Sequence, residues 1–267
     1  MTALALSTPG LFAALDRRQP LLARAGWASL ALLLLCLAAM TVDARLINGV
    51  SVWTKPAKFA ASFVVWFWTL AWAWGVLEPA AQRGATARLV LWGTLAAAWF
   101  EMGWITLRGA LGQPSHFATD PLGDVMYQLM GAGAVTLVAL AATLGVLVLR
   151  RGDATRQARG WIFAIGWGLV LTGILGGLTG ATISGAGTSH IGGMPSDAAN
   201  LPPFYWSRNG GDLRIAHFLG VHAMQALPAL ALLLPGASTR LLALGAAGWT
   251  AMTLAVFAAG LLGVPLP

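Results

Sequence analysis

Long hydrophobic runs, separated by short polar segments, make up most of the chain. Runs bounded by charged residues, Pro or Gly predict seven helices, because crossing a bilayer takes about 20 mostly apolar residues. We place these helices at residues 24–42, 57–77, 88–107, 122–149, 160–183, 212–235 and 240–264. The pattern therefore predicts an all-α, polytopic membrane helix bundle, in which residues 24–267 form a single transmembrane domain.

The first 23 residues do not fit a membrane span. Their leucine-rich stretches are interrupted by Pro9 and Gly10 and are followed by Asp16, Arg17 and Arg18. The segment is too short to cross the membrane and has no small-residue cleavage site of a signal peptide. We interpret residues 1–23 as an amphipathic helix on the cytoplasmic membrane surface.

Composition supports this class of protein. Of 267 residues, 58% are hydrophobic and 9% are charged, whereas soluble domains carry roughly a quarter charged residues. This balance excludes a soluble globular protein and an intrinsically disordered one. The single cysteine, Cys36, excludes an internal disulfide and a cysteine-based metal site. A bound metal would therefore need His, carboxylate or Met ligands.

Positive charge is distributed unevenly between the two predicted sides. One side holds ten arginines against three acidic residues: Arg17, Arg18, Arg24, Arg83, Arg88, Arg150, Arg151, Arg156, Arg159 and Arg240 against Asp16, Glu78 and Asp153. Lys and Arg in short loops stay on the cytoplasmic side. The N-terminus is thus predicted to be cytoplasmic and the C-terminus outside, in a bacterial-type inner membrane. The net charge of +7 marks orientation in the lipid bilayer and needs no nucleic acid partner.

The other acidic residues and all four histidines fall on the predicted outer side. They are Asp43, Glu101, Asp120, Asp124, Asp197 and Asp212, with His116, His190, His217 and His222. This asymmetry predicts an outward-facing polar site. The alternative is that ionisable groups simply collect in the longer outer loops.

Glu101 lies about two turns inside the predicted helix 88–107. A carboxylate at this depth must face the bundle interior and find a partner. Arg108 is two turns further along the same stripe and is the nearest partner within the helix. We predict catalytic roles for Glu101, Arg108 and Asp124, which lies near the outer end of the next helix. The alternative for Glu101 and Arg108 is a structural ion pair.

The predicted helix 212–235 has a polar face and a capped start. Asp212 is a suitable N-cap, and Arg214, His217, His222 and Gln225 lie on one face. On a regular helix the two histidines are about 140° apart, too wide for both to bind one ion without further ligands. We predict both as metal ligands, with Arg214 and Gln225 as cofactor-binding residues.

Loops are predicted to complete this metal site. His116 and His190 each follow a Gly-containing stretch that can fold over the mouth of the bundle. The predicted cofactor is a divalent ion (Zn, Cu or Fe) or haem b. Lys58 is predicted to bind the cofactor, or else to extend outward to the membrane surface. Glycines around Thr172 and Thr179 in the predicted helix 160–183 are expected to permit close helix packing.

Three functions remain open from these residues. The first is a metal- or haem-dependent membrane enzyme, redox or hydrolytic, acting on a lipid-like or quinone-like substrate. The second is a transporter or ligand-binding receptor, although the inner half of the bundle has almost no ionisable residues and no inverted repeat is evident. The third is an accessory subunit of a larger membrane complex or a homo-oligomer.

Overall fold

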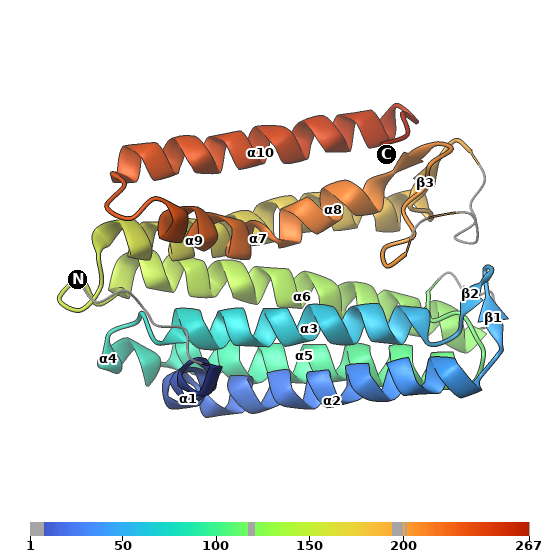
Figure 1. Cartoon of the computed structure of the whole chain (residues 1–267), viewed down its shortest axis with the longest axis horizontal. Coiled ribbons are helices and arrows are strands. Elements are labelled where there is room, and N and C mark those ends of the chain that lie inside the picture. The colour runs from blue at the N-terminus through green and yellow to red at the C-terminus, as the bar shows by residue number, and fades with distance from the viewer. Residues whose placement is uncertain (1–7, 117–120, 194–199, 201, 267) are drawn as a thin grey trace.

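Long helices run side by side along the longest axis of the molecule (Figure 1). The computed structural model describes residues 8–116, 121–193, 200 and 202–266. In this part of the chain five helices are long and apolar enough to cross a membrane: Pro20–Val42 (α2), Ala85–Ala110 (α5), Pro121–Arg151 (α6), Arg159–Ala186 (α7) and Thr239–Leu261 (α10). The bent pair Leu213–Val221 (α8) and Ala223–Leu233 (α9) makes a sixth if it counts as one span. The predicted all-α bundle of apolar helices is confirmed.

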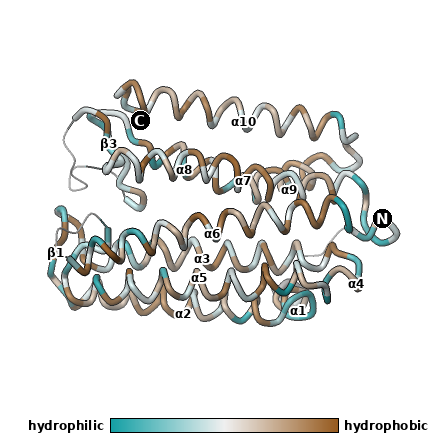
Figure 2. Tube along the Cα trace, turned by 180° about the vertical axis from the view of Figure 1, so that it is seen from behind, coloured by the Kyte–Doolittle hydropathy of each residue, from teal (hydrophilic) through white to brown (hydrophobic). Residues whose placement is uncertain are grey.

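The number of spans differs from the predicted seven. Thr54–Trp74 (α3) is not among the membrane-span candidates, although it is 21 residues long and lies beside α2 and α5. Its tryptophans, lysines and hydroxyl side chains lower its mean hydropathy. The seven-span count and the orientation therefore stay predictions. Figure 2 shows hydrophobic residues along the long helices and hydrophilic residues gathered at the two ends of the bundle.

The N-terminal segment contains a separate helix, Thr8–Arg18 (α1), seen end-on beside α2 in Figure 1. The ring of Phe12 packs against Trp27 and Trp68, with centroids 4.6 and 5.7 Å away. The guanidinium of Arg18 lies 3.8 Å from the Trp72 ring. The next helix starts at Pro20 rather than at residue 24, because the Gln19 side chain accepts the Leu21 N–H and caps it. The membrane-surface location of α1 stays a prediction.

Close backbone approach joins the two halves of the bundle. The helix α6 lies between the α2–α3–α5 group and the α7–α10 group (Figure 1). A Cβ atom on Gly145 of α6 would lie 2.6 Å from the Gly166 carbonyl oxygen of α7. A Cβ on Gly220 of α8 would lie 2.9 Å from the Leu175 carbonyl carbon of α7. The helix α7 thus packs tightly on both sides, as its glycines led us to expect.

Two short strand pairs lie at the end of the molecule opposite α1 and the short helix Pro79–Gln82 (α4) (Figure 1). Leu46–Ile47 (β1) pairs with Val50–Ser51 (β2) through a two-residue turn in which Asn48 and Gly49 have φ of 51° and 81°. Such turns need residues that tolerate positive φ. His190–Ile191 (β3) pairs with Gly211–Asp212 (β4) and places His190 opposite Asp212. The apolar pattern did not predict these strands.

The packing at Gly220 predicts a sensitive position. We expect Gly220→Ala to destabilise the protein by about 1–3 kcal/mol, because the new methyl group meets the α7 backbone rather than a movable side chain. Gly248→Ala in α10 is the control, since a Cβ there meets nothing within 4 Å. Thermal unfolding in detergent should show a lower Tm for the first variant only. Equal Tm values for Gly220→Ala and Gly248→Ala would contradict the interpretation that α8 packs closely against α7.

Candidate functional site

The helix predicted over residues 212–235 is broken at His222. The two halves, α8 and α9, meet at an angle of 55°. At the break, the Thr172 hydroxyl of α7 accepts the Met224 N–H at 3.0 Å and donates to the Val221 carbonyl at 3.1 Å. A side chain inserted into the helical hydrogen-bond ladder bends the helix. The predicted continuous helix is interrupted where Thr172, from another helix, bonds these two backbone groups, and Pro228 lies inside α9 shortly after the break.

The break lies near the middle of the bent helix pair. The helix α8 has nine residues and α9 has eleven, so the break is about 13 Å from the start of the pair. Irregular backbone within a membrane span is tolerated where protein buries it or where it lines a cavity. Ligand sites of several membrane transporters lie at such discontinuous helices. The break is therefore our candidate functional site.

His222 is held at the break by one of its two ring nitrogens. Its Nδ1 lies 3.0 Å from Oε1 of Gln225, and Nε2 of Gln225 donates to Oγ1 of Thr69 on α3 at 2.9 Å. An amide oxygen only accepts hydrogen bonds, so Nδ1 of His222 donates. A neutral ring then has a hydrogen-bond acceptor at Nε2. Gln225, predicted to bind a cofactor, orients the imidazole.

Thr69 was missed in the sequence analysis, although a signal was present. Lys58 and Thr69 are eleven residues apart, about three helical turns, and so lie on the same stripe of α3. Extending that stripe inward from Lys58 would have placed Thr69 opposite the polar face of the predicted helix 212–235.

His217 faces α7 rather than α3. Its Nδ1 lies 3.1 Å from the hydroxyl of Thr179, which donates its own hydrogen to the Leu175 carbonyl at 2.7 Å. The Thr179 oxygen therefore accepts from His217. Gly180 makes room for the ring, because a Cβ there would lie 3.1 Å from Cε1 of His217. His217 thus contacts α7 directly, whereas His222 is connected to α3 through Gln225.

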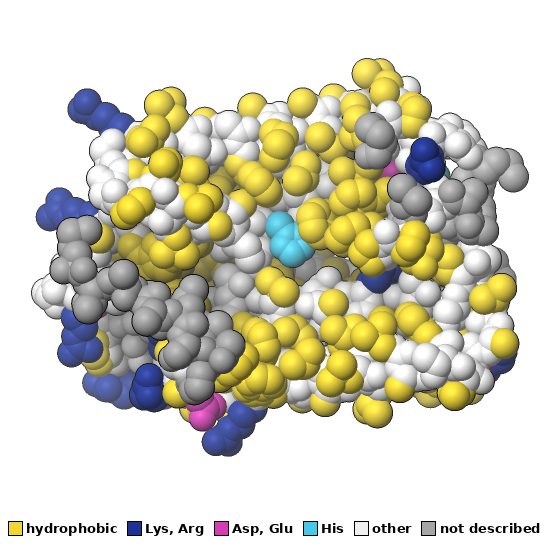
Figure 3. All heavy atoms as spheres, viewed as in Figure 1, with side chains coloured by type: hydrophobic (Ala, Val, Ile, Leu, Met, Phe, Trp, Pro, Cys, Tyr) yellow, Lys and Arg dark blue, Asp and Glu magenta, His cyan; other side chains and the backbone are white. Residues whose placement is uncertain are grey.

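Aromatic side chains cover the outer side of His222. Phe204 and Trp206 stack at 4.6 Å between centroids, and both meet the ring of Phe218 edge-on. The Phe218 centroid is 4.1 Å from that of His222. Lys58 of α3 reaches across and donates to the Phe204 carbonyl at 3.3 Å. Figure 3 shows a histidine side chain in a hollow between two rows of hydrophobic side chains near the middle of this face.

We call the region around His222 the furrow. It is bounded by α3, which contributes Lys58 and Thr69, and by α8 and α9, which contribute Phe218, His222 and Gln225. Aromatic side chains of Phe204, Trp206 and Phe218 lie at its outer side. The furrow therefore combines an aromatic cluster with polar side chains, among which His222 offers an oriented acceptor.

A second polar group ties the loops to the start of α8. Asp212 accepts the Arg214 N–H at 2.9 Å, which confirms the predicted N-cap, and pairs with the Arg214 guanidinium at 2.7 Å. Arg214 also contacts Nε2 of His190 at 3.2 Å and the Tyr205 carbonyl at 2.8 Å. Burial raises the pKa of Asp212, but the hydrogen bonds and charge of Arg214 outweigh it and hold the pKa below its usual range. Arg214 thus connects two parts of the loop between α7 and α8 to the start of α8.

A third group surrounds His116. Its Nδ1 lies 3.0 Å from Nζ of Lys55, and its ring is edge-on to Tyr127 at 5.9 Å. Burial, followed by the positive charge of Lys55, lowers the pKa of His116 from 6.5 to about 3. His116 is therefore neutral at physiological pH and accepts a hydrogen bond from the ammonium of Lys55.

The predicted pair of Glu101 and Arg108 does not form. The Glu101 side chain is buried against α6, where a Cβ on Gly133 would lie 2.6 Å from its Oε1. That oxygen has no hydrogen-bond partner within the described residues. Arg108 instead donates to the Pro114 carbonyl at 2.9 Å, because the loop carbonyl is nearer than a carboxylate two turns away. Asp124 is exposed in the first turn of α6, and the catalytic roles of all three residues stay predictions.

The histidines are not gathered into one metal site. In the described ranges, no three His, Cys, Asp or Glu side chains come close enough to hold a metal ion. The loop histidines His116 and His190 have contacts with Lys55 and Arg214, away from the break. The described residues therefore give no support to a coordination sphere closed by these loops around His217 and His222, which stays a prediction. Asp120 and Asp197 lie outside the described residues, and the Zn, Cu, Fe and haem b assignments stay predictions.

Comparisons with protein families, curated proteins and solved structures find no match. The functional argument therefore uses the geometry of the chain itself.

His116 predicts a pH dependence of stability. Its pKa is lower in the folded chain, so between 6.5 and about 3 the unfolded chain binds more protons and stability falls as the pH falls. We expect wild type to lose more thermal stability than His116→Gln between about pH 7 and about pH 5, where most carboxylates stay ionised. Equal losses would contradict the burial of a neutral imidazole. The other histidines are common to both proteins.

Proposed function

We propose that the protein binds a small lipid-soluble molecule bearing a hydroxyl group, such as a quinol, in the furrow beside His222. The observation that carries this proposal is the fixed ring of His222. Gln225 takes its Nδ1 hydrogen and leaves Nε2 as an acceptor beside apolar and aromatic side chains. A ligand from the bilayer that donates one hydrogen bond matches this lining.

The proposal keeps the predicted quinone-like or lipid-like ligand class and selects its hydroxyl form. A quinol donates to Nε2, whereas a quinone offers only acceptor oxygens to an acceptor nitrogen. Aromatic rings of Phe204, Trp206 and Phe218 supply the stacking surface that a flat ring prefers. Oxidation of a quinol also needs a separate acceptor for two electrons; with such an acceptor present, His222 is the group placed to receive a hydroxyl proton.

A ligand-binding receptor or transporter is the second candidate, and the broken span favours it. Ligand sites of several transporters lie at discontinuous helices, and His222 lies at such a break here. The same furrow would then bind the ligand without chemistry. Turnover of the bound quinol by the purified protein separates the enzyme from the receptor.

The binding prediction compares a short-tailed benzoquinol with its dimethyl ether, measured by anaerobic equilibrium binding in lipid nanodiscs. Wild type should prefer the quinol, because the ether keeps the ring and tail but donates no hydrogen bond. His222→Ala should weaken quinol binding by about threefold to tenfold, the effect of one net hydrogen bond, and remove the preference.

Gln225→Ala should weaken quinol binding in the same direction, because it releases the ring of His222 from its fixed orientation. The matched control is Gln128→Ala, which removes an exposed side chain of α6 and should change nothing. Equal affinity of wild type for quinol and ether would refute the proposal.

A further inference from the structure

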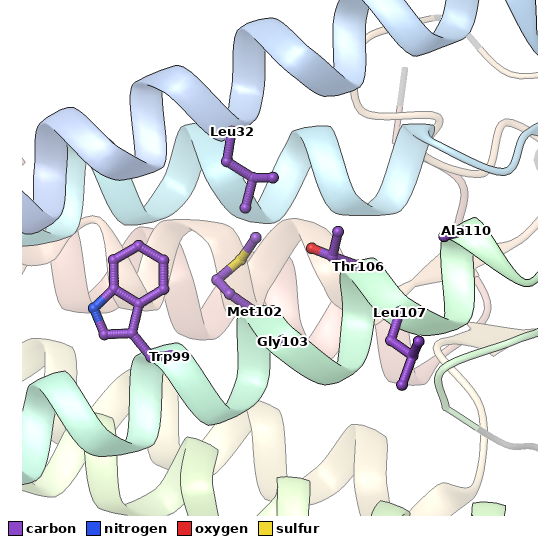
Figure 4. A pocket seen from close by; sticks show the side chains of 7 residues that line it. All are labelled: Leu32, Trp99, Met102, Gly103, Thr106, Leu107 and Ala110. Carbon is purple, nitrogen blue, oxygen red and sulfur yellow. The ribbon is translucent and has the colours of Figure 1, made fainter.

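A short loop segment lies over the furrow beside His222. Residues 204–206 belong to the loop between α7 and α8, and two of their three rings pack against Phe218 of α8. We call these three residues the aromatic turn. The groove between α2 and α5, about 310 Å³ in volume, is built differently: Leu32 and Met102 point into it, and all its lining residues belong to these two helices (Figure 4). The aromatic turn thus gives the furrow a cover that this groove does not have.

The aromatic turn is attached to both sides of the furrow. On the α8 side, Nη2 of Arg214 donates to the Tyr205 carbonyl at 2.8 Å. On the α3 side, Nζ of Lys58 donates to the Phe204 carbonyl at 3.3 Å and lies 5.5 Å from the centre of the Tyr205 ring. The two bonded carbonyls are adjacent in the sequence, but their donors belong to different helices. The turn therefore spans the furrow from α8 to α3.

The two attachments differ in strength. The Arg214 guanidinium is fixed by three hydrogen bonds to the carboxylate of Asp212, which is buried at the start of α8. The bond from Lys58 is longer than the roughly 2.7–3.2 Å that is usual for an N–H···O hydrogen bond, and a flexible side chain makes it. The turn is therefore released more easily from α3 than from α8.

The backbone of the aromatic turn is strained. Tyr205 has a φ of 57°, in the left-handed region that is unfavourable for a bulky residue. Residues persist in this region only where surrounding contacts enforce it, and they are common in switch segments and ligand clamps. Here the strain accompanies a stack of the Phe204 and Trp206 rings, with 4.6 Å between centroids and 13° between planes. The observed form of the turn thus depends on its attachments and on this stack.

We propose that the aromatic turn is a lid over His222 and that Lys58 is the positioning residue that holds the lid shut. The lid covers the imidazole through Phe218, whose ring centroid is 4.1 Å from that of His222. When Lys58 releases the Phe204 carbonyl, the strain at Tyr205 favours opening, while the α8 side stays attached. The closed lid excludes water and so strengthens a hydrogen bond made to His222. This inference rests on the proposed function for the identity of the ligand behind the lid.

The test measures how fast a thiol at position 222 reacts with a reagent from solution. In a Cys36→Ala background, His222→Cys carries the only thiol of the full chain, which is reconstituted in lipid nanodiscs. The reagent is a trimethylammonium methanethiosulfonate, whose fixed charge keeps it in water, and intact mass gives the modified fraction over time. Lys58→Met should speed labelling about threefold to tenfold, the effect of one net hydrogen bond on the open fraction. Lys58→Arg keeps a donor and should leave the rate of the background protein unchanged.

The matched control is Lys55→Met. Lys55 is one turn from Lys58 on α3 and contacts His116, so its loss should not change labelling at position 222. A second variant, Phe204→Ala, keeps Lys58 but removes a ring of the lid, and it should also speed labelling. Equal rates in the background protein, Lys58→Met and Phe204→Ala would overturn the proposal, as would equally fast labelling in Lys55→Met or Lys58→Arg. The assay contains no quinol, so a failed lid is distinguished from a failure of the proposed function, which has its own binding test.

Discussion

A backbone group inside a bilayer has no water to bond, and this constraint explains how the break between α8 and α9 is stabilised. Without Thr172, the Met224 N–H and the Val221 carbonyl would be left unpaired in a low-dielectric interior, at a cost of several kcal/mol. One hydroxyl satisfies both groups. The 55° bend, and with it the orientation of His222, therefore depends on a side chain of the neighbouring helix.

Close packing of α7 makes this contact available. A hydroxyl can enter another helix only if the two backbones approach closely, and Gly168, Gly176 and Gly220 permit that approach. A Cβ on Gly168 would lie 2.9 Å from the Ala223 carbonyl, immediately after the break. The small residues of α7 thus place Thr172 at the break and Thr179 at His217.

Polar groups elsewhere mostly stabilise the ends of the bundle. Asp212, Arg214 and His190 connect the start of α8 to the α7–α8 loop, and Lys55 contacts His116 on the loop after α5. Glu101 is different, because it is buried in a span and its Oε1 has no bonded partner in the described part of the chain. The polar residues predicted on the outer side therefore form three groups: contacts among the loops, the buried carboxyl of Glu101 and the imidazole of His222 at the break.

The sequence by itself determined the membrane class, the all-α architecture and most helix positions, because each span must be apolar and must satisfy its own backbone. It also predicted the Asp212 cap, a local interaction within two residues. The break at His222, the separation of the four histidines and the turn of Arg108 toward Pro114 were decided only by the tertiary structure. Each depends on a partner from a distant part of the chain or from a loop, and helical periodicity describes only neighbours on the same helix.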